Sequence, residues 1–311
     1  MNKFISLNDI LNLNQFIKKA LYLKSNPYQF SHLGKNKTLV MLFFNASLRT
    51  RLSTEKAAKN LGINVSILNI SQTWNIEFDD GAIMNLNTSE HVKEVARVLS
   101  QYADMIAIRA FPSLKNKEKD NSEYIINSFV KYARVPVINM ESATSHPLQA
   151  LADAITITET QTVINPKIVL SWVPHPKALP HSVANVFVQL MHRMQVEFVI
   201  THPKKYELNP AITKNTPIEY NQKEAFKDAH FIYAKIWSYY IDYGKVINQD
   251  PNWMITLEKL GKAKFMHCLP IRRNVVAEDA VLNSNNSLVI HQANNRTFAT
   301  QAVLQQILLN L

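Results

Sequence analysis

The sequence predicts an α/β protein built from two doubly wound parallel-sheet domains that are joined by two crossing helices. Short apolar runs rich in β-branched residues alternate with longer segments of helical period along the chain. Because such continuous apolar strands have to be covered on both faces, they indicate parallel sheets flanked by helices. A length of 311 residues with 47% hydrophobic content suffices for two domains of ordinary size.

The strand predictions rest on apolar runs bounded by polar or turn-forming residues. They cover residues 38–44, 65–70, 104–109, 135–139, 167–173, 197–201, 230–234, 264–267 and 287–290. Helices are expected where apolar residues recur every three or four positions, at residues 51–61, 91–102, 122–132, 147–158, 182–194, 223–227 and 296–311. We expect one domain to comprise residues 1–145 plus 292–311 and the other residues 146–291, with the helices at 147–158 and 296–311 crossing between them.

The formal charge of +10 at pH 7 favours an anionic partner. Short groups of lysines lack the interleaved aromatic residues that stack on bases, so we interpret them as solvated surface and expect no nucleic-acid partner. These groups are Lys115, Lys117 and Lys119, and Lys204 and Lys205.

Several other function classes are disfavoured by composition. Cys268 is the single cysteine, which excludes an intrachain disulfide and favours a reducing, cytoplasmic location. No apolar run approaches the roughly 18 residues of a membrane span, so no membrane partner is expected. The five glycines cannot form a dinucleotide-binding or P-loop motif. No residues have convincing metal-ligand spacing, and we expect neither a metal nor a cofactor.

A candidate anion site lies where the first long apolar run gives way to a helical segment. The turn reads Ser47-Leu48-Arg49-Thr50-Arg51. A helix that starts after a strand aims unpaired backbone N–H groups and its positive dipole end at one point, where anions bind. Ser47 and Thr50 add hydroxyl groups, while Arg49 and Arg51 add guanidinium forks suited to phosphate or carboxylate oxygens. This stretch predicts a phosphate cradle, and the alternative is a plain helix start with solvated arginines.

Further polar residues follow predicted strands at the end where a doubly wound sheet binds ligands. Arg109 closes the run 104–109, either as a ligand contact or as a solvated strand end. Glu141 and His146 follow the next run, where a solvated carboxylate and a helix-capping histidine are the plain alternatives. Beside the cradle, His146 is a candidate donor to a carbonyl oxygen that gains negative charge, and Gln149 lies one turn further on.

The second half of the chain contains a proline-rich segment, a strand-end lysine and the lone cysteine. Three prolines between Val173 and His181 predict a stiff, extended loop. Lys235 closes a strand with a cation that suits a carboxylate. Cys268 invites a nucleophile hypothesis, which we disfavour because thiolate catalysis calls for a pKa-lowering partner and an acyl intermediate.

Three stretches resemble, in order, the signatures of the transcarbamylases, the enzymes that move a carbamoyl group from carbamoyl phosphate to an amine. They are Ser47-Leu48-Arg49-Thr50-Arg51, His146-Pro147-Leu148-Gln149 and His267-Cys268-Leu269-Pro270. Because they are widely spaced along essentially the whole chain, the sequence is identified as a member of this family and is most similar to its N-acylornithine branch.

The resemblance implies a set of site residues in both halves of the chain. Carbamoyl phosphate is expected to bind Ser47, Leu48, Arg49, Thr50, Trp74, Arg109, His146, Gln149, Cys268, Leu269 and Arg296. Arg49, Thr50, Arg109 and His146 are the expected catalytic residues. The acylated amino acid is expected to bind Glu141, His175, Lys235, Arg272 and Ser89.

Two positions bear on the acceptor substrate. Where ornithine enzymes of the family carry a Ser-Met-Gly motif for a free amino group, this chain reads Trp237-Ser238-Tyr239-Tyr240, which argues against free ornithine. Ser89 stands where acetyl-specific relatives have a glutamate and succinyl-specific relatives typically a proline. A serine would not repel a succinyl carboxylate. The expected acceptor is therefore N2-succinyl-L-ornithine, and N-acetyl-L-ornithine is the alternative.

The implied reaction yields N-succinyl-L-citrulline and phosphate, a step in arginine synthesis. The resemblance also implies a homotrimer in which Trp74 reaches the neighbouring subunit's site, and a knot in which the proline-rich loop is threaded through a second loop. A distant alternative is a non-catalytic basic α/β protein whose affinity for polyanions would fall steeply with salt.

Overall fold

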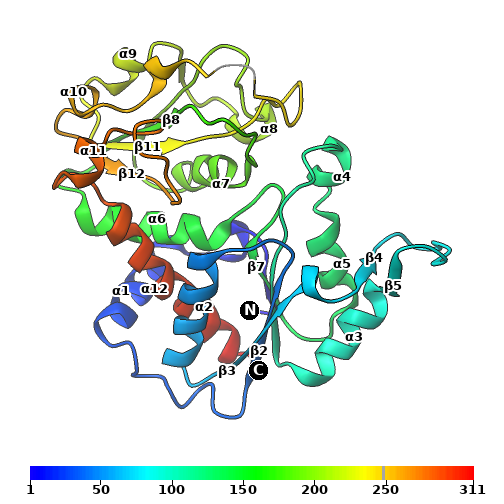
Figure 1. The fold of residues 1–311 in the computed structure, drawn as a ribbon. Coiled ribbons are helices and arrows are strands. Elements are labelled where there is room, and N and C mark those ends of the chain that lie inside the picture. The colour runs from blue at the N-terminus through cyan, green and yellow to red at the C-terminus, as the bar shows by residue number, and fades with distance from the viewer. Residues whose placement is uncertain (247–248) are drawn as a thin grey trace. The chain divides into compact units, whose positions relative to one another are not determined.

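The computed structural model describes residues 1–246 and 249–311, apart from the side chain of Ser71, and divides into two units (Figure 1). Unit 1 comprises Met1–Ser113, Lys117–Leu151 and Arg296–Leu311, and unit 2 comprises Leu114–Asn116 and Ala152–Asn295. Helices α6 (Pro147–Thr160) and α12 (Val289–Leu308) each contribute residues to both units.

Unit 1 is organised on a five-stranded sheet in the order β1-β7-β6-β2-β3, and every pairing in it is parallel. Its strands are β1 (Lys3–Phe4), β2 (Thr38–Phe43), β3 (Asn64–Asn69), β6 (Met105–Arg109) and β7 (Val137–Glu141). The chain adds β3 on one side of β2 and then places β6 and β7 on the other side. The direction of winding therefore reverses between β2 and β6, and such a switch point is where open α/β sheets bind ligands.

Helices cover both faces of this sheet. In Figure 1, α3 (Val92–Tyr102) and α5 (Tyr124–Tyr132) lie on one side of the strands, and α1 (Leu13–Ser25) and α2 (Leu48–Asn60) lie on the other. A core cluster joins α3 and α5 to alternate residues of the strands, among them Val40, Leu42, Ala96, Ile106 and Phe129. The remaining elements of unit 1 are η1 (Leu7–Asp9), η2 (Ile70–Gln72), α4 (Lys117–Asn121) and a small parallel pair, β4 (Asn75–Glu77) with β5 (Thr88–His91).

Unit 2 repeats the design with a parallel sheet in the order β10-β9-β8-β11-β12. Its strands are β8 (Lys167–Trp172), β9 (Glu197–Thr201), β10 (Ile218–Glu219), β11 (Phe231–Lys235) and β12 (Lys264–Met266). Because β9 and β10 extend one side of β8 and β11 and β12 the other, the winding reverses between β8 and β11. The shorter elements of unit 2 are α7 (Ser182–Met191), α8 (Pro210–Thr213), α9 (Gln222–Phe226), η3 (Pro251–Trp253), α10 (Leu257–Leu260) and α11 (Asp279–Asn283).

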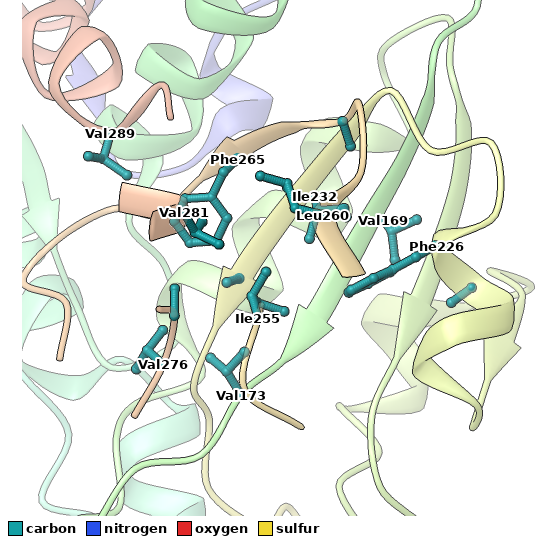
Figure 2. Close-up of a cluster of buried hydrophobic side chains, with 14 of the residues drawn as sticks. Val169, Val173, Phe226, Ile232, Ile255, Leu260, Phe265, Val276, Val281 and Val289 are labelled. Atoms are coloured by element: carbon teal, nitrogen blue, oxygen red, sulfur yellow. The ribbon is translucent and has the colours of Figure 1, made fainter. Parts of the chain in front are cut away.

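A continuous apolar cluster fills one face of the unit 2 sheet (Figure 2). Val169 of β8, Ile232 of β11 and Phe265 of β12 pack against Phe226 of α9 and Leu260 of α10. These side chains are at least 90% buried. In Figure 1, α7 lies on the opposite face of this sheet from α9 and α10, so both faces are covered. The predicted α/β class with two parallel sheets is thus confirmed.

Two predictions at the level of single elements were wrong. Residues 287–290 do not form a strand: Ser287 makes only an isolated bridge to Phe265, and α12 begins at Val289. The short apolar run is the first turn of a helix that starts seven residues before the predicted start at 296. Helix α1 was not predicted at all, although its buried residues at 13, 16, 17, 20 and 23 follow helical spacing and the Asn12 side chain caps it by accepting from the Gln15 N–H.

Among the described residues, none of the helices combines the length and the apolar character that crossing a membrane would demand.

The two leucines of α10 offer a matched test of the unit 2 core. Leu260 is 2% exposed and belongs to the cluster, whereas Leu257 is 44% exposed. We expect Leu260→Ala to lower the free energy of unfolding by about 2–5 kcal/mol because it leaves a cavity, and Leu257→Ala to change it by less than about 0.5 kcal/mol. Denaturant unfolding followed by circular dichroism measures both, and equal effects would contradict the described packing.

Candidate active site

The predicted cradle forms at the carboxyl end of β2. Helix α2 starts at Leu48, three residues earlier than predicted, so Arg49 and Thr50 belong to its first turn. Ser47 is the N-cap, and its Oγ accepts from the Thr50 backbone N–H at 3.3 Å. The backbone N–H groups at this helix start have no intrahelical acceptor, and with the helix dipole they favour an anion. Thr50 is buried, Arg49 is half-buried, and Arg51 is exposed.

Arg109, the last residue of β6, is the centre of the unit 1 site. Its Nη1 donates to the carbonyl oxygens of Asn45 and Ala46, both at 2.8 Å, in the turn that precedes the cradle. Its Nε and Nη2 lie 3.2 and 3.1 Å from Oε2 of Glu141 at the end of β7. The guanidinium also stacks 4.1 Å from the ring centroid of Phe111. With 6% of the residue exposed, the alternative of a solvated strand end is wrong.

Glu141 and His146 complete a buried charged cluster beside Arg109. Glu141 ends β7 and is 7% exposed, so it is not the solvated loop carboxylate that was the alternative. Nε2 of His146 lies 3.6 Å from Oε2 of Glu141. Burial lowers the pKa of Arg109, and the nearby Glu141 charge opposes that shift. The ion pair therefore keeps a buried cation charged next to the cradle.

A second arginine reaches the cradle from α12. Nη2 of Arg296 donates to the Thr50 hydroxyl at 2.8 Å, and Nη1 donates to Oε1 of Gln149 at 3.1 Å. Arg296 and Gln149 are 5% and 0% exposed. This network brings together three segments that are far apart in the sequence, namely the starts of α2 and α6 and the middle of α12.

The unit 1 cluster suits a small anion. Arg49, Arg109 and Arg296 supply three cations against the one carboxylate of Glu141. A water-poor site with such preorganised donors stabilises negative charge that develops on a reacting oxygen. Among residues 1–246 and 249–311, no group of three or more His, Cys, Asp or Glu side chains is arranged to hold a metal ion.

The switch point of unit 2 carries a separate group of cations. The strand register pairs Lys235, the last residue of β11, with Trp172, the last residue of β8. Lys235 is 8% exposed. The proline-rich segment that follows β8 carries His175, whose Nε2 accepts from Nε of Arg272 at 3.1 Å. Lys235, His175 and Arg272 are therefore brought together, as predicted for acceptor-binding residues, with their carboxylate-binding role still a prediction.

Both ring nitrogens of His175 have polar neighbours. Nε2 accepts from Nε of Arg272, and Nδ1 lies 2.8 Å from the Lys177 carbonyl oxygen and 3.0 Å from the Lys177 backbone nitrogen. Burial lowers the pKa of His175, the hydrogen bond to the Lys177 backbone opposes this shift, and the positive charges of Arg272, Lys235 and Lys177 lower the pKa further. His175 is consequently a neutral hydrogen-bonding group among three cations at neutral pH.

Cys268 and Leu269 follow β12, the strand next to β11. Leu269 is a non-glycine residue in the left-handed region, with φ of 51°. Its backbone N–H donates to Nδ1 of His267 at 2.9 Å, and the His267 N–H donates to Oε1 of Gln292 at 3.0 Å. This segment is a shaped turn held by polar contacts.

Trp74 and Ser89 lie on the small β4–β5 pair of unit 1. Trp74 precedes β4 and is 54% exposed, while Ser89 is an exposed residue of β5. The indole Nε1 of Trp74 donates to Oε2 of Glu90 at 2.8 Å.

Sequence reasoning missed two residues of these clusters. Asn45 supplies a carbonyl to Arg109 and a side-chain oxygen that accepts from the Phe111 N–H at 2.6 Å. Lys177 supplies a cation near His175. An asparagine directly after a strand and a lysine within a proline-rich loop are the only local signals, since the partners lie elsewhere in the chain.

Family comparisons cover most of the chain. Residues 2–159 match the model of the aspartate/ornithine carbamoyltransferase carbamoyl-P binding domain, and residues 180–307 match that of the Asp/Orn binding domain. The N-succinylornithine carbamoyltransferase of Bacteroides fragilis is 44% identical over 100% of both chains. That of Bacteroides thetaiotaomicron is 43% identical over 99% of both, and the N-acetylornithine carbamoyltransferase of Xylella fastidiosa is 36% identical over 92% of this chain and 93% of its own.

Solved structures give the same picture. An acetylornithine transcarbamylase complexed with acetylcitrulline matches with a TM-score of 0.92, at 33% identity over 99% of both chains. A variant of N-acetyl-L-ornithine transcarbamylase in which a glutamate is replaced by serine, complexed with carbamyl phosphate and N-succinyl-L-norvaline, matches with a TM-score of 0.90 at 34% identity, over 98% of this chain and 99% of its own.

Removing Arg109 tests the buried ion pair. We expect Arg109→Gln to lower the free energy of unfolding by about 3–5 kcal/mol because the Glu141 carboxylate stays buried without this cation. The double variant Arg109→Gln/Glu141→Gln should be more stable than the single one in denaturant unfolding. Arg134→Gln, at an exposed position, is the control. A double variant no more stable than Arg109→Gln would contradict this description.

The protonation of His175 can be measured directly by NMR titration of its ring. We expect a pKa below the ordinary value of about 6.5, and a rise toward that value in Arg272→Gln, which removes both a neighbouring charge and a donor to Nε2. Arg273→Gln is the matched control, since Arg273 pairs with Asp279 at 2.8 Å instead. A pKa at or above the ordinary value in the wild type would refute the arrangement.

Proposed function

Because this chain belongs to the aspartate/ornithine carbamoyltransferase family, we propose that it transfers the carbamoyl group of carbamoyl phosphate to the δ-amine of N2-succinyl-L-ornithine. The products are N-succinyl-L-citrulline and phosphate, which places the step in arginine synthesis. In this proposal residues 1–145 and 292–311 form the carbamoyl phosphate-binding domain, and residues 146–291 form the acylornithine-binding domain.

The observation that carries the proposal is the cradle itself, with two buried arginines directed at the start of α2. Arg296 contacts Thr50 at 2.8 Å, and Arg109 holds the preceding turn through two carbonyl groups. Burying guanidinium groups beside a helix amino terminus is costly unless an anion is bound there. Carbamoyl phosphate has the required charge and a carbonyl group next to it.

The proposed roles divide the phosphate from the carbamoyl group. The phosphate binds Ser47, Leu48, Arg49, Thr50 and Arg109, with Arg296 completing the pocket and Trp74 supplied by a neighbouring subunit. The carbonyl oxygen accepts from Thr50, Arg109 and His146. The carbamoyl nitrogen is held by Gln149 and by the carbonyl groups of Cys268 and Leu269.

Transfer then needs no covalent enzyme intermediate. The neutral δ-amine attacks the carbonyl carbon, forming the new C–N bond while the C–O bond to phosphate breaks. Thr50, Arg109 and His146 stabilise the oxygen that gains negative charge. The departing phosphate takes the proton from the amine. Catalysis in this scheme comes from positioning and electrostatic stabilisation.

The acceptor assignment rests on charge. N2-succinyl-L-ornithine carries two carboxylates, and unit 2 presents the cations of Lys235, Arg272 and Lys177 around the neutral His175. The acetyl compound has only one carboxylate. In this proposal the Glu141 carboxylate contacts the acceptor near its δ-amine. Two curated relatives at 43–44% identity are N-succinylornithine carbamoyltransferases, whereas the N-acetyl enzymes are more distant, at 34–36%.

Ser89 is the proposed acceptor-selecting residue of unit 1. Acetyl-specific relatives carry a glutamate at this position, and the related transcarbamylase in which a glutamate is replaced by serine was crystallised with an N-succinyl ligand. In this chain the neighbouring Glu90 accepts a hydrogen bond from the Trp74 indole at 2.8 Å. Ser89 itself adds no charge that would repel a succinyl carboxylate.

Three further features belong to the proposal. They are a homotrimer with Trp74 reaching the adjacent site, a knot formed by the proline-rich segment after β8, and a cytoplasmic location in keeping with the single cysteine, Cys268, which forms no disulfide. Light scattering of the purified protein tests the trimer.

The direct test is carbamoyl transfer to N-succinylornithine, N-acetylornithine and ornithine at equal concentration. We expect the succinyl compound to react fastest.

Ser89→Glu should reduce kcat/KM for N-succinylornithine by about tenfold or more, because like charges in contact cost several kcal/mol, while the uncharged Ser89→Gln should reduce it less. A higher rate with the acetyl compound would instead indicate an N-acetylornithine carbamoyltransferase. No transfer to any acceptor would refute the enzyme assignment and favour a basic binding protein, which salt-dependent nucleic-acid binding would reveal.

A further inference from the structure

A buried carboxylate outside the proposed substrate contacts lies behind the Cys268–Leu269 turn. Asp153 of α6 is 0% exposed, and its Oδ1 accepts from Nε2 of Gln292 on α12 at 2.7 Å. Burying a carboxylate costs several kcal/mol, and an apolar residue of similar size would pack without that cost. A buried carboxyl group such as that of Asp153 is explained if its hydrogen bond to Gln292 favours a single arrangement of the surrounding side chains.

Gln292 transmits the contact to the turn. Its Oε1 accepts from the His267 N–H at 3.0 Å, and Nδ1 of His267 accepts from the Leu269 N–H at 2.9 Å. Gln292 and His267 are each 1% exposed. A chain of three hydrogen bonds thus runs from Asp153 to the backbone of Leu269, entirely within unit 2.

The direction of this chain is set by Asp153. A glutamine amide has a donor end and an acceptor end of nearly equal size, and either could face the turn. The Asp153 carboxyl oxygen accepts from the Nε2 end, which leaves Oε1 for the His267 N–H. With the amide reversed, two donors would face each other at His267.

The turn needs such support because of its backbone conformation. Leu269 has φ of 51°, a region that costs a non-glycine residue about 1–3 kcal/mol and persists only when its surroundings impose it. Tyr233 of β11 is fully buried, and its hydroxyl lies near the Asp153 carboxylate and the Cys268 thiol. Burial, followed by these two neighbours, raises the pKa of Tyr233, so the hydroxyl stays protonated.

We propose that Asp153 is a positioning residue which, by orienting the Gln292 amide, holds the carbonyl groups of Cys268 and Leu269 where they receive the carbamoyl nitrogen. The proposal rests on the proposed function for the role of those carbonyl groups. The geometry of the brace itself, meaning the three hydrogen bonds from Asp153 to Leu269, does not depend on it.

A reversal of polarity tests the brace. Gln292→Glu places a carboxylate against Asp153 and should lower kcat by about tenfold to 100-fold, since displacement of a reacting group by about 1 Å can cost that much. The KM for the acceptor should change little, because Lys235 and Arg272 are untouched. Asp153→Asn alone should lower kcat less than Gln292→Glu, because its amide oxygen can still accept from Gln292, although its amide no longer fixes which end of Gln292 it faces.

The double variant Asp153→Asn/Gln292→Glu should recover most of the lost rate. In it the amide introduced at position 153 donates to the carboxylate introduced at position 292, whose other oxygen accepts from the His267 N–H. The chain of hydrogen bonds is thereby restored with its first bond reversed. Asn294→Asp places the same negative charge at an exposed position of α12 and is the control. If Gln292→Glu lowers kcat only by adding a negative charge to α12, the double variant should not recover kcat.

A second readout is independent of catalysis. Cys268 is the single cysteine, so the rate at which a disulfide reagent labels the folded protein reports the turn. Labelling should accelerate in Gln292→Glu and return to the wild-type rate in the double variant. If wild type shows no carbamoyl transfer while this labelling pattern holds, the proposed function fails and the brace stands.

The brace is refuted by any of three results. The first is a Gln292→Glu variant with wild-type kcat and labelling rate. The second is a double variant as slow and as readily labelled as Gln292→Glu. The third is failure of both variants to fold, because the restored hydrogen bonds should also restore stability.

Discussion

The unit 1 site depends on one buried guanidinium. Arg109 binds Glu141 with two of its nitrogens and the carbonyl groups of Asn45 and Ala46 with the third, so a strand end, its neighbouring strand and the turn before the cradle are held by one side chain. A lysine could not do this, because it lacks a planar fork with several donors. The carboxylate keeps the arginine charged inside the protein, and the two carbonyl groups fix the guanidinium against the turn that precedes α2.

The two parallel sheets explain why the chemistry collects where it does. In each sheet the winding reverses once, between β2 and β6 in unit 1 and between β8 and β11 in unit 2. Loops that leave the strands on either side of a reversal run in opposite directions, which leaves room above the carboxyl ends of the strands. Arg109 and Lys235 end strands that border these two points, and the cradle and the proline-rich segment follow the other bordering strands.

Two buried carboxylates serve the two units in different ways. Glu141 forms an ion pair with Arg109. Replacing the two residues should therefore have non-additive effects on the free energy of unfolding. Asp153 faces an amide and acts through orientation, because the carboxylate determines which end of Gln292 meets the turn. Both contacts place a carboxyl group in a region of low dielectric, where a satisfied polar network favours a single arrangement and a broken one is costly.

The sequence alone determined the α/β class, the parallel strands, the strand-to-helix turn of the proposed phosphate cradle and the membership of the transcarbamylase family. These features are local: strand and helix periods, a helix start after a strand and short motifs are all written in neighbouring residues. Only the tertiary structure decided that Glu141 pairs with Arg109, that Asn45 supports it, that α12 begins at Val289 and that Asp153 meets Gln292, 139 positions away. Which residues become partners depends on strand register and side-chain direction. Both are set only when distant segments pack together, so they cannot be predicted from neighbouring residues.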